Sequence, residues 1–306
     1  MNPLFETIII GAGPAGLTAA IYAGRFKLKA LFFEKMAAGG QILLSPSIEN
    51  YPGFPEGVST FDLMDKFKKQ VGDLGIKIED KEVQSIVQEG KNYLVKTPDG
   101  DFLTQTVIIA VGAQSKRLGV IGEERLIGKG VSYCGTCDGP LFKNKDVVVI
   151  GGGDRAVEDA LFLTSYANKV TLIHRRNEFR AAKVLVDKIK SNPKIELILE
   201  SVAFEVLGDN RVIGVRIKNL KSNKESVVDC QGVFIFVGIK PNTEFIRNLL
   251  EVDEFGFIIV TPEMKTSKAG IFACGDCISK SLYQVISAAG EGAIAADSVH
   301  KYLLKL

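Results

Sequence analysis

The chain has 306 residues, of which 46% are hydrophobic and 24% are charged, and its formal net charge is +2. This length favours two domains with separate cores, and so small a charge does not indicate a nucleic-acid or membrane-surface partner. No stretch approaches the roughly 18 continuous apolar residues of a membrane-spanning helix, and the five cysteines do not suggest a secreted disulfide framework. We therefore expect a cytoplasmic protein.

The chain opens with a strand, a glycine-rich turn and a helix. The apolar run Thr7–Ile10 predicts a buried strand, Gly11–Gly16 forms the turn, and a helix is expected over about Pro14–Gly24. In this arrangement the N–H groups at the helix N-terminus bind a pyrophosphate. Glu34 ends the next strand, Leu28–Glu34, where it can accept a hydrogen bond from a ribose 2′-OH and would repel a 2′-phosphate.

The segment that follows is rich in helix breakers and predicts a loop, with Gly39–Gln41 at one end and Glu49–Pro55 at the other. Phe61–Leu74 then has helical spacing and precedes several short alternating strands. Val107–Gly112 predicts a buried strand that ends in glycine.

Cys134-Gly135-Thr136-Cys137 has the CxxC spacing of a dithiol that opens and closes without large backbone strain. Asp138 follows directly and could move a proton as a thiolate leaves or returns. The alternative is a zinc half-site, with Cys274–Cys277 as the second half. Zinc ribbons usually space their pairs roughly 15–20 residues apart, so we expect no metal here. Cys274, Cys277 and Cys230 are instead expected to be buried.

A second glycine turn, Gly151–Ala156, follows the apolar strand Val147–Ile150 and predicts a second dinucleotide site. Its next strand ends in His174-Arg175-Arg176, with Arg180 close behind. These arginines form a candidate clamp for a 2′-phosphate. The alternative is a solvated basic face, which would be favoured for His174 alone.

The remaining tail, from Lys240 on, is too short for a third nucleotide domain and ends in a helix rich in small residues. We expect it to return to the first domain. The predicted fold is α/β, with two Rossmann-like dinucleotide-binding domains of the three-layer ββα type. The first is discontinuous over 1–113 and 242–306, and the second, 114–241, is inserted in it and carries the CxxC.

These motifs together resemble the low-molecular-weight thioredoxin reductases, the NADPH-dependent flavoproteins of bacteria. The resemblance rests on eight segments: Gly11–Gly16, Gly39–Gln41, Glu49–Pro55, Cys134–Gly139, Gly151–Ala156, His174–Arg180, Gly275–Asp276 and Gln284–Gly292. It implies FAD on the first domain, NADPH on the inserted one, thioredoxin as the disulfide substrate and a homodimer.

The resemblance also implies roles for individual residues. Cys137 would face the flavin, Cys134 would exchange with thioredoxin, and Asp138 would be the acid/base. Asp276 and Gln284 would contact the flavin and its ribityl chain, with Asn50 beside it. The candidate cofactor-binding residues are Gly11, Gly13, Pro14, Ala15, Gly16, Glu34, Gly40, Gln41, Asn50, Gly112, Gly275, Asp276, Gln284 and Val285 on the first domain, and Gly151, Gly153, Arg155, Ala156, His174, Arg175, Arg176 and Arg180 on the inserted one.

The chain departs from the family pattern in three places. Arg155 stands where the family usually has serine or threonine, and Tyr283 where a basic residue usually precedes the glutamine. Cys274 and Cys277 replace small aliphatic residues.

Several other functions remain as alternatives. They are a flavoprotein that uses ferredoxin or a small-molecule dithiol, a peroxide-reductase flavoprotein subunit, and a non-catalytic redox sensor. The arginine cluster argues against the ferredoxin and small-dithiol readings. The absence of a thiol domain before Gly11 argues against the peroxide-reductase subunit, and steady turnover with NADPH would distinguish an enzyme from a sensor.

Overall fold

The computed structural model describes residues 3–44, 47–48, 50–133 and 135–306. The chain divides into two compact units. The first unit comprises Met1–Gln114 and Lys240–Leu306, and the second is Ser115–Ile239. Cys134 lies outside the described residues. Among those described, no helix is both long and apolar enough to cross a lipid bilayer.

The first unit is built on a seven-stranded sheet in the order β5-β2-β1-β8-β7-β6, with β19 also paired to β8. Strand β1 is central, since Ile8 pairs with Leu31 on one side and with Val107 on the other, in parallel register. Strands β6 and β7 continue from β8 as an antiparallel meander. The strands are β1 (Leu4–Ile10), β2 (Ala30–Glu34), β5 (Ile78–Asp80), β6 (Ser85–Glu89), β7 (Asn92–Thr97), β8 (Gly100–Ile109) and β19 (Ile271–Ala273).

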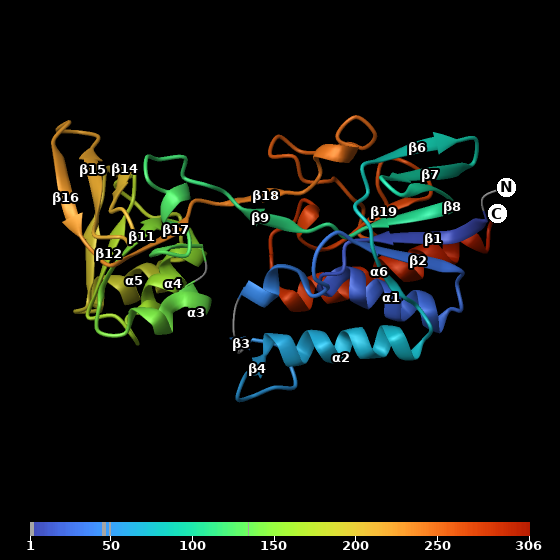
Figure 1. The fold of residues 1–306 in the computed structure, drawn as a ribbon, viewed down its shortest axis with the longest axis horizontal. Helices are drawn as coiled ribbons and strands as arrows, with labels where there is room; N and C mark the ends of the chain where they lie inside the picture. Colours follow the sequence, from blue (N-terminus) through green and yellow to red (C-terminus); the bar gives the residue numbers. More distant parts are fainter. Residues whose placement is uncertain (1–2, 45–46, 49, 134) are drawn as a thin grey trace. The chain divides into compact units, whose positions relative to one another are not determined.

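Three helices accompany this sheet (Figure 1): α1 (Pro14–Arg25), α2 (Thr60–Asp73) and α6 (Val285–Leu303). Helices α1 and α6 pack closely because their contact is made by small residues. A Cβ built on Gly292 of α6 would lie 2.1 Å from the Ala15 carbonyl oxygen of α1. The tail thus returns to the first unit through both α6 and β19.

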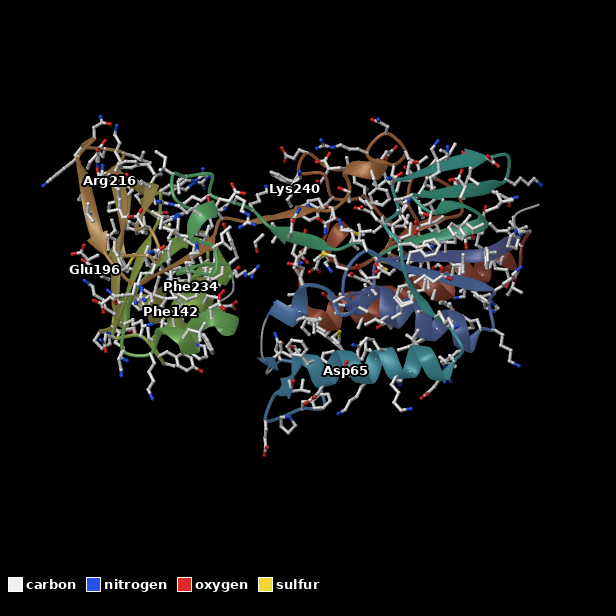
Figure 2. All side chains as sticks on the ribbon, in the orientation of Figure 1. Asp65, Phe142, Glu196, Arg216, Phe234 and Lys240 are labelled. Carbon is white, nitrogen blue, oxygen red and sulfur yellow. The ribbon has the colours of Figure 1, made fainter. Side chains whose placement is uncertain are left out.

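The second unit has the same plan, with a parallel sheet in the order β10-β17-β11-β12-β13 and an antiparallel meander β14-β15-β16. Its core includes an edge-to-face contact between Phe142 and Phe234, 5.2 Å between ring centroids (Figure 2). The elements are β10 (Val131–Ser132), α3 (Gly135–Asp138), β11 (Asp146–Gly151), α4 (Asp154–Leu163), β12 (Lys169–Ile173), α5 (Lys183–Ser191), β13 (Ile195–Ile198), β14 (Ser201–Leu207), β15 (Gly214–Asn219), β16 (Glu225–Asp229) and β17 (Gly232–Phe236).

The two chain connections between the units, β9 (Ala113–Ser115) and β18 (Ile239–Pro241), pair with each other. A further short pair is β3 (Ser47–Ile48) with β4 (Val58–Ser59). The predicted helix at Phe61–Leu74 begins one residue earlier, at Thr60, because Ser59 Oγ accepts a hydrogen bond from Asp62 N and caps it. Short 3₁₀ turns occur at Gly40–Leu44, Glu124–Leu126, Gly139–Phe142, Glu244–Ile246 and Gly275–Cys277.

Candidate active site

The first glycine turn has a backbone that only glycine can form. Gly11 follows β1 with a φ of +98°, and a Cβ on it would lie 2.5 Å from the Ala110 carbonyl oxygen. A Cβ on Gly16 would lie 1.8 Å from the Gly11 oxygen, so the first turn of α1 rests directly on the loop. Between strand and helix the chain has only Gly11, Ala12 and Gly13, so its single side chain there is the methyl group of Ala12.

The N-terminus of α1 is suited to an anion. Its N-cap is Gly13, which has no side chain to satisfy the first N–H groups, and Pro14 begins the helix. The Gly39–Gln41 segment, which was predicted as part of a loop, lies beside this N-terminus, and a 3₁₀ turn begins within it at Gly40. A Cβ on Gly40 would lie 2.9 Å from the Gly13 Cα, and Gly39 N donates to Ala12 O at 2.7 Å. Free N–H groups and a glycine-lined approach leave room for a pyrophosphate.

Glu34 holds the loop as well as ending β2. Its Oε2 accepts from Ala12 N at 2.6 Å and its Oε1 from Met36 N at 2.9 Å. Each carboxylate oxygen has a second lone pair, so this half-buried side chain can still receive a ribose hydroxyl. The Glu34 carboxylate therefore joins the glycine loop to the end of β2.

Residues far apart in sequence meet at the start of α6. Asn50 Nδ2 donates to Gln284 Oε1 at 2.9 Å. Gln284 is also the N-cap of α6, in a reciprocal capping box with Ser287. Val285 is the first residue of the helix, so the predicted residues Asn50, Gln284 and Val285 form one cluster.

Asp276 carries a polar atom that lacks a hydrogen-bond partner. Its Oδ1 is buried without one. Lys280 Nζ lies 3.1 Å away, close enough for an ion pair but without hydrogen-bond geometry. The preceding Gly275 has a φ of +77°. A carboxylate oxygen whose one close contact is an ion pair can still accept a hydrogen bond from a ligand that carries a donor.

The sequence analysis missed Lys280 and Glu291. Lys280 Nζ donates to Glu291 Oε2 at 2.9 Å and to Oε1 at 3.2 Å, and Gly275 N donates to the same Oε2 at 2.9 Å. Burial opposes the charge on Lys280, yet Asp276 and Glu291 together hold the lysine pKa above its ordinary value. Burial raises the pKa of Glu291, against the opposite effect of Lys280. The available signal was that, with Asp276, they are the charged residues of the otherwise small, polar or apolar stretch 270–296.

The second glycine turn repeats the geometry of the first. A Cβ on Gly151 would lie 2.5 Å from the Phe236 carbonyl oxygen and 2.6 Å from the Ala156 Cβ. The N-cap of α4 is Gly153, again without a side-chain cap, and a Cβ on it would meet nothing within 4 Å. This helix also begins without a side-chain cap, and the space around its N-cap glycine is open.

His174 is separated from the arginines that follow it in sequence. The residue is 6% exposed. A Cβ built on Gly152 would lie only 2.1 Å from the His174 Cε1, so the ring packs directly against this glycine. Its Nε2 lies 3.1 Å from Glu178 O, and burial lowers its pKa, so it supports the turn as a neutral ring. Arg175, Arg176 and Arg180 are exposed, and Arg180 N donates to Gly152 O at 2.8 Å. The cationic part of the predicted clamp is these three arginines.

Arg155 makes contacts other than those expected of a pyrophosphate ligand. Its Nη2 donates to Tyr133 O at 3.1 Å, and its Nε lies 3.8 Å from Asp159 Oδ2. Its guanidinium also lies over the Phe236 ring, 5.4 Å from the centroid. The side chain is thus engaged with the residue that precedes Cys134.

The predicted dithiol is only partly covered by the structure. Cys134 lies outside the described residues, as does the side chain of Cys137, although the backbone of Cys137 belongs to α3. Asp138 ends α3 and is half-buried. Helix α3 packs against α4, the helix that begins at the second glycine turn.

The other cysteines are buried thiols. Cys230, Cys274 and Cys277 are free and 0% exposed, as expected for core residues. Cys277 Sγ donates to Cys274 O at 3.2 Å, and burial raises the Cys277 pKa to about 12. Across the described ranges, no group of three or more histidines, cysteines or acids could hold a metal ion.

Comparisons with known proteins agree with one another. The family described as pyridine nucleotide-disulphide oxidoreductase matches residues 5–292. A thioredoxin reductase of Mycolicibacterium smegmatis is 42% identical over 299 residues, 97% of this chain and 96% of that protein. One of Dictyostelium discoideum is 43% identical over 312 residues, covering 98% of each. The solved thioredoxin reductase of Lactococcus lactis is 39% identical with a TM-score of 0.88, over 99% of this chain and all of that one.

Proposed function

The chain belongs to the pyridine nucleotide-disulphide oxidoreductases and, within them, to the low-molecular-weight thioredoxin reductases, and we propose that its two units divide the work between FAD and NADPH around a Cys134–Cys137 dithiol. The enzyme uses NADPH and FAD to reduce the disulfide of thioredoxin. The overall reaction is NADPH + H⁺ + thioredoxin disulfide → NADP⁺ + thioredoxin dithiol. The observation that carries the division is the pair of equivalent glycine turns, whose next strands end in a carboxylate and in arginines.

The first unit fits FAD. The uncapped N-terminus of α1 would hold the pyrophosphate, and Glu34 would accept the ribose hydroxyl. Asp276, whose Oδ1 makes no hydrogen bond, and the Asn50–Gln284 pair would bind the flavin end. When bound, FAD supplies the redox chemistry that links hydride transfer from a nicotinamide to reduction of a disulfide.

The inserted unit fits NADPH. The uncapped N-terminus of α4 would hold the pyrophosphate, and the exposed Arg175, Arg176 and Arg180 would bind the 2′-phosphate. His174 stays neutral beneath the turn and contributes no charge to the clamp. The arginines that follow β12 would therefore select NADPH for the inserted unit, and the Glu34 carboxylate at the end of β2 would exclude NADPH from the first unit.

The dithiol connects these sites to the protein substrate. Cys134 would attack the thioredoxin disulfide as a thiolate, and Cys137 would then close on Cys134 to release reduced thioredoxin. Asp138 would carry the proton that the departing or returning thiolate exchanges. These assignments rest on the CxxC-Asp sequence and on the family membership.

The deciding experiment is an anaerobic NADPH titration followed by absorbance, with and without oxidised thioredoxin, on the wild type and two serine variants. Cys134→Ser leaves Cys137 as a lone thiolate beside the flavin, so we expect a long-wavelength charge-transfer band that Cys137→Ser lacks. Both variants should lose thioredoxin reduction. A reversed pattern of bands would exchange the two roles, and full activity in both variants would refute the dithiol.

Ferredoxin, small-molecule dithiol and peroxide-reductase alternatives are not favoured by the relatives. We also propose a homodimer, on the family resemblance, and a cytoplasmic location, on the three free buried thiols. Light scattering would measure the oligomeric state, and cell fractionation would test the location.

A further inference from the structure

One buried cation in the first unit remains without a role in the proposed chemistry. The Lys280 side chain is 10% exposed and the Glu291 side chain 14% exposed. A lysine is this deeply buried only where carboxylates compensate for its lost hydration. Here the compensation comes from Glu291 and Asp276.

Lys280 connects two elements that both belong to the candidate FAD site. Asp276 lies in the Gly275–Cys277 turn, and Glu291 lies on α6. Glu291 reaches back to the same turn, because its Oε2 also accepts from Gly275 N. The ammonium group therefore ties the turn that carries Asp276 to the helix that begins beside Gln284.

The surroundings of Lys280 also include the residue that departs from the family pattern. Tyr283 stands where a basic residue is usual, and its ring faces Lys280 Nζ at 5.4 Å from the centroid. The ring in turn packs on Phe257, 5.6 Å away. A cation over an aromatic face is stabilised by the ring quadrupole, so Tyr283 helps to stabilise the buried ammonium group of Lys280.

We infer that Lys280 is a positioning residue of the FAD site, which holds the Asp276 carboxylate in place and balances the negative charge beside the flavin. The inference rests on the proposed assignment of the first unit to FAD. The cluster of Lys280, Asp276 and Glu291 contains one cation and two carboxylates, so loss of Lys280 adds net negative charge and loss of Glu291 removes it. The two changes should therefore act oppositely on the ease of flavin reduction.

The test measures FAD affinity and the flavin midpoint potential in Lys280→Met and Glu291→Gln. FAD affinity is measured by reconstituting apoprotein, and the potential by equilibration with redox dyes. We expect Lys280→Met to weaken FAD binding at least about tenfold, the cost of a charge-assisted contact, and to lower the potential. Glu291→Gln should raise the potential.

Two further variants separate charge from positioning. Lys280→Met combined with Glu291→Gln restores the net charge of the cluster, so its potential should return toward that of the wild type while FAD affinity stays low. Lys280→Arg should recover part of the affinity, since the cation is retained. The matched control is Lys69→Met on α2, where an exposed lysine pairs with Asp73. It should change neither quantity.

The outcomes distinguish this inference from the proposed function. A wild-type protein that does not bind FAD or does not reduce thioredoxin with NADPH would refute the proposed function. The role of Lys280 is overturned if the wild type does both and Lys280→Met matches it in affinity and potential. If the potential shifted in the same direction in both single variants, the charge balance would be overturned. Opposite charge changes should shift the potential in opposite directions, whereas a general loosening of the fold gives no reason for opposite shifts.

Discussion

At the scale of single residues, the site depends on which polar groups are already engaged. Glu34 is bound to two backbone N–H groups and His174 is buried under Gly152, while Arg175, Arg176 and Arg180 are exposed. Glu34 and His174 shape the two turns, and we propose that the three arginines supply charge to a ligand. Arg155 belongs with the engaged residues, because its guanidinium is bound to Tyr133 O and paired with Asp159.

Replacing Arg175 and Arg176 by alanine should raise the KM for NADPH by at least about tenfold and leave the KM for NADH nearly unchanged, because each charge-assisted bond to the 2′-phosphate is worth roughly 1.5–3 kcal/mol. Steady-state kinetics with both nucleotides measures this. Arg125→Ala, an exposed arginine of the same unit paired with Asp209, is the control. Equal losses with the two nucleotides would contradict the clamp.

Asp159 predicts a pH-dependent stability. Burial raises its pKa from 3.8 to about 6, against the lowering effect of Arg155. The neutral carboxyl is favoured in the folded state, so its contribution is fully present below pH 3.8 and is lost as the pH rises through about 6. The loss amounts to roughly 3 kcal/mol at most.

Asp159→Asn should not show this loss. Calorimetry of the holoenzyme between about pH 4.5 and pH 7.5 should therefore show the variant gaining Tm relative to the wild type as the pH rises. A difference in Tm that stays constant with pH would contradict the raised pKa.

At the scale of elements, close packing of α6 on α1 positions the residues of the proposed FAD site. Gly292 allows α6 to approach the Ala15 backbone, and the start of the same helix carries Gln284 and Val285. Glu291, next to Gly292, binds the turn at Gly275. Any change that separates the two helices should displace these residues together.

Two glycines of α6 provide a matched test. A Cβ on Gly292 would lie 2.1 Å from Ala15 O, whereas one on Gly290 would meet nothing within 4 Å. Gly292→Ala should cost about 1–3 kcal/mol of stability through overpacking and should release FAD more readily. Gly290→Ala should be neutral or stabilise by up to about 1 kcal/mol. Thermal unfolding and flavin fluorescence measure both, and equal behaviour of the two variants would rule out the helix contact as the cause.

At the scale of the whole molecule, two compact units are joined by two connections. The proposed dithiol and NADPH site are both assigned to the inserted unit, and in this proposal both must reach one FAD site on the other unit. Gly112 and Gly238 flank the paired strands β9 and β18 with φ values of +63° and +113°, where glycine can absorb backbone changes. We expect the units to reorient in each catalytic cycle, on the μs–ms timescale of domain motions.

A disulfide engineered between the two units, verified by mass spectrometry, should therefore abolish multiple turnover of thioredoxin. One flavin reduction per enzyme should survive if the cross-link keeps the nicotinamide site on the flavin. Stopped-flow absorbance measures the single reduction, and the corresponding single-cysteine variants are the controls. Undiminished turnover in the cross-linked enzyme would show that reorientation is not needed.

The sequence by itself determined the local chemistry of this protein. The α/β fold with two dinucleotide-binding halves followed from apolar strands that run into Gly11–Gly16 and Gly151–Ala156, because a glycine turn between a buried strand and a helix is a local pattern. The charges at the two strand ends, Glu34 and the arginines, are also local. The CxxC-Asp motif was likewise read from adjacent residues.

Only the tertiary structure decided which distant residues meet and which side chains remain free. The bond between Asn50 and Gln284, the burial of His174 beneath Gly152, and the binding of Arg155 to Tyr133 depend on how elements pack. The ion cluster at Lys280 is the clearest case. Its members come from a turn, a helix and the segment between them, and only burial within the first unit brings these three ordinary surface residue types together as one compensated charge group.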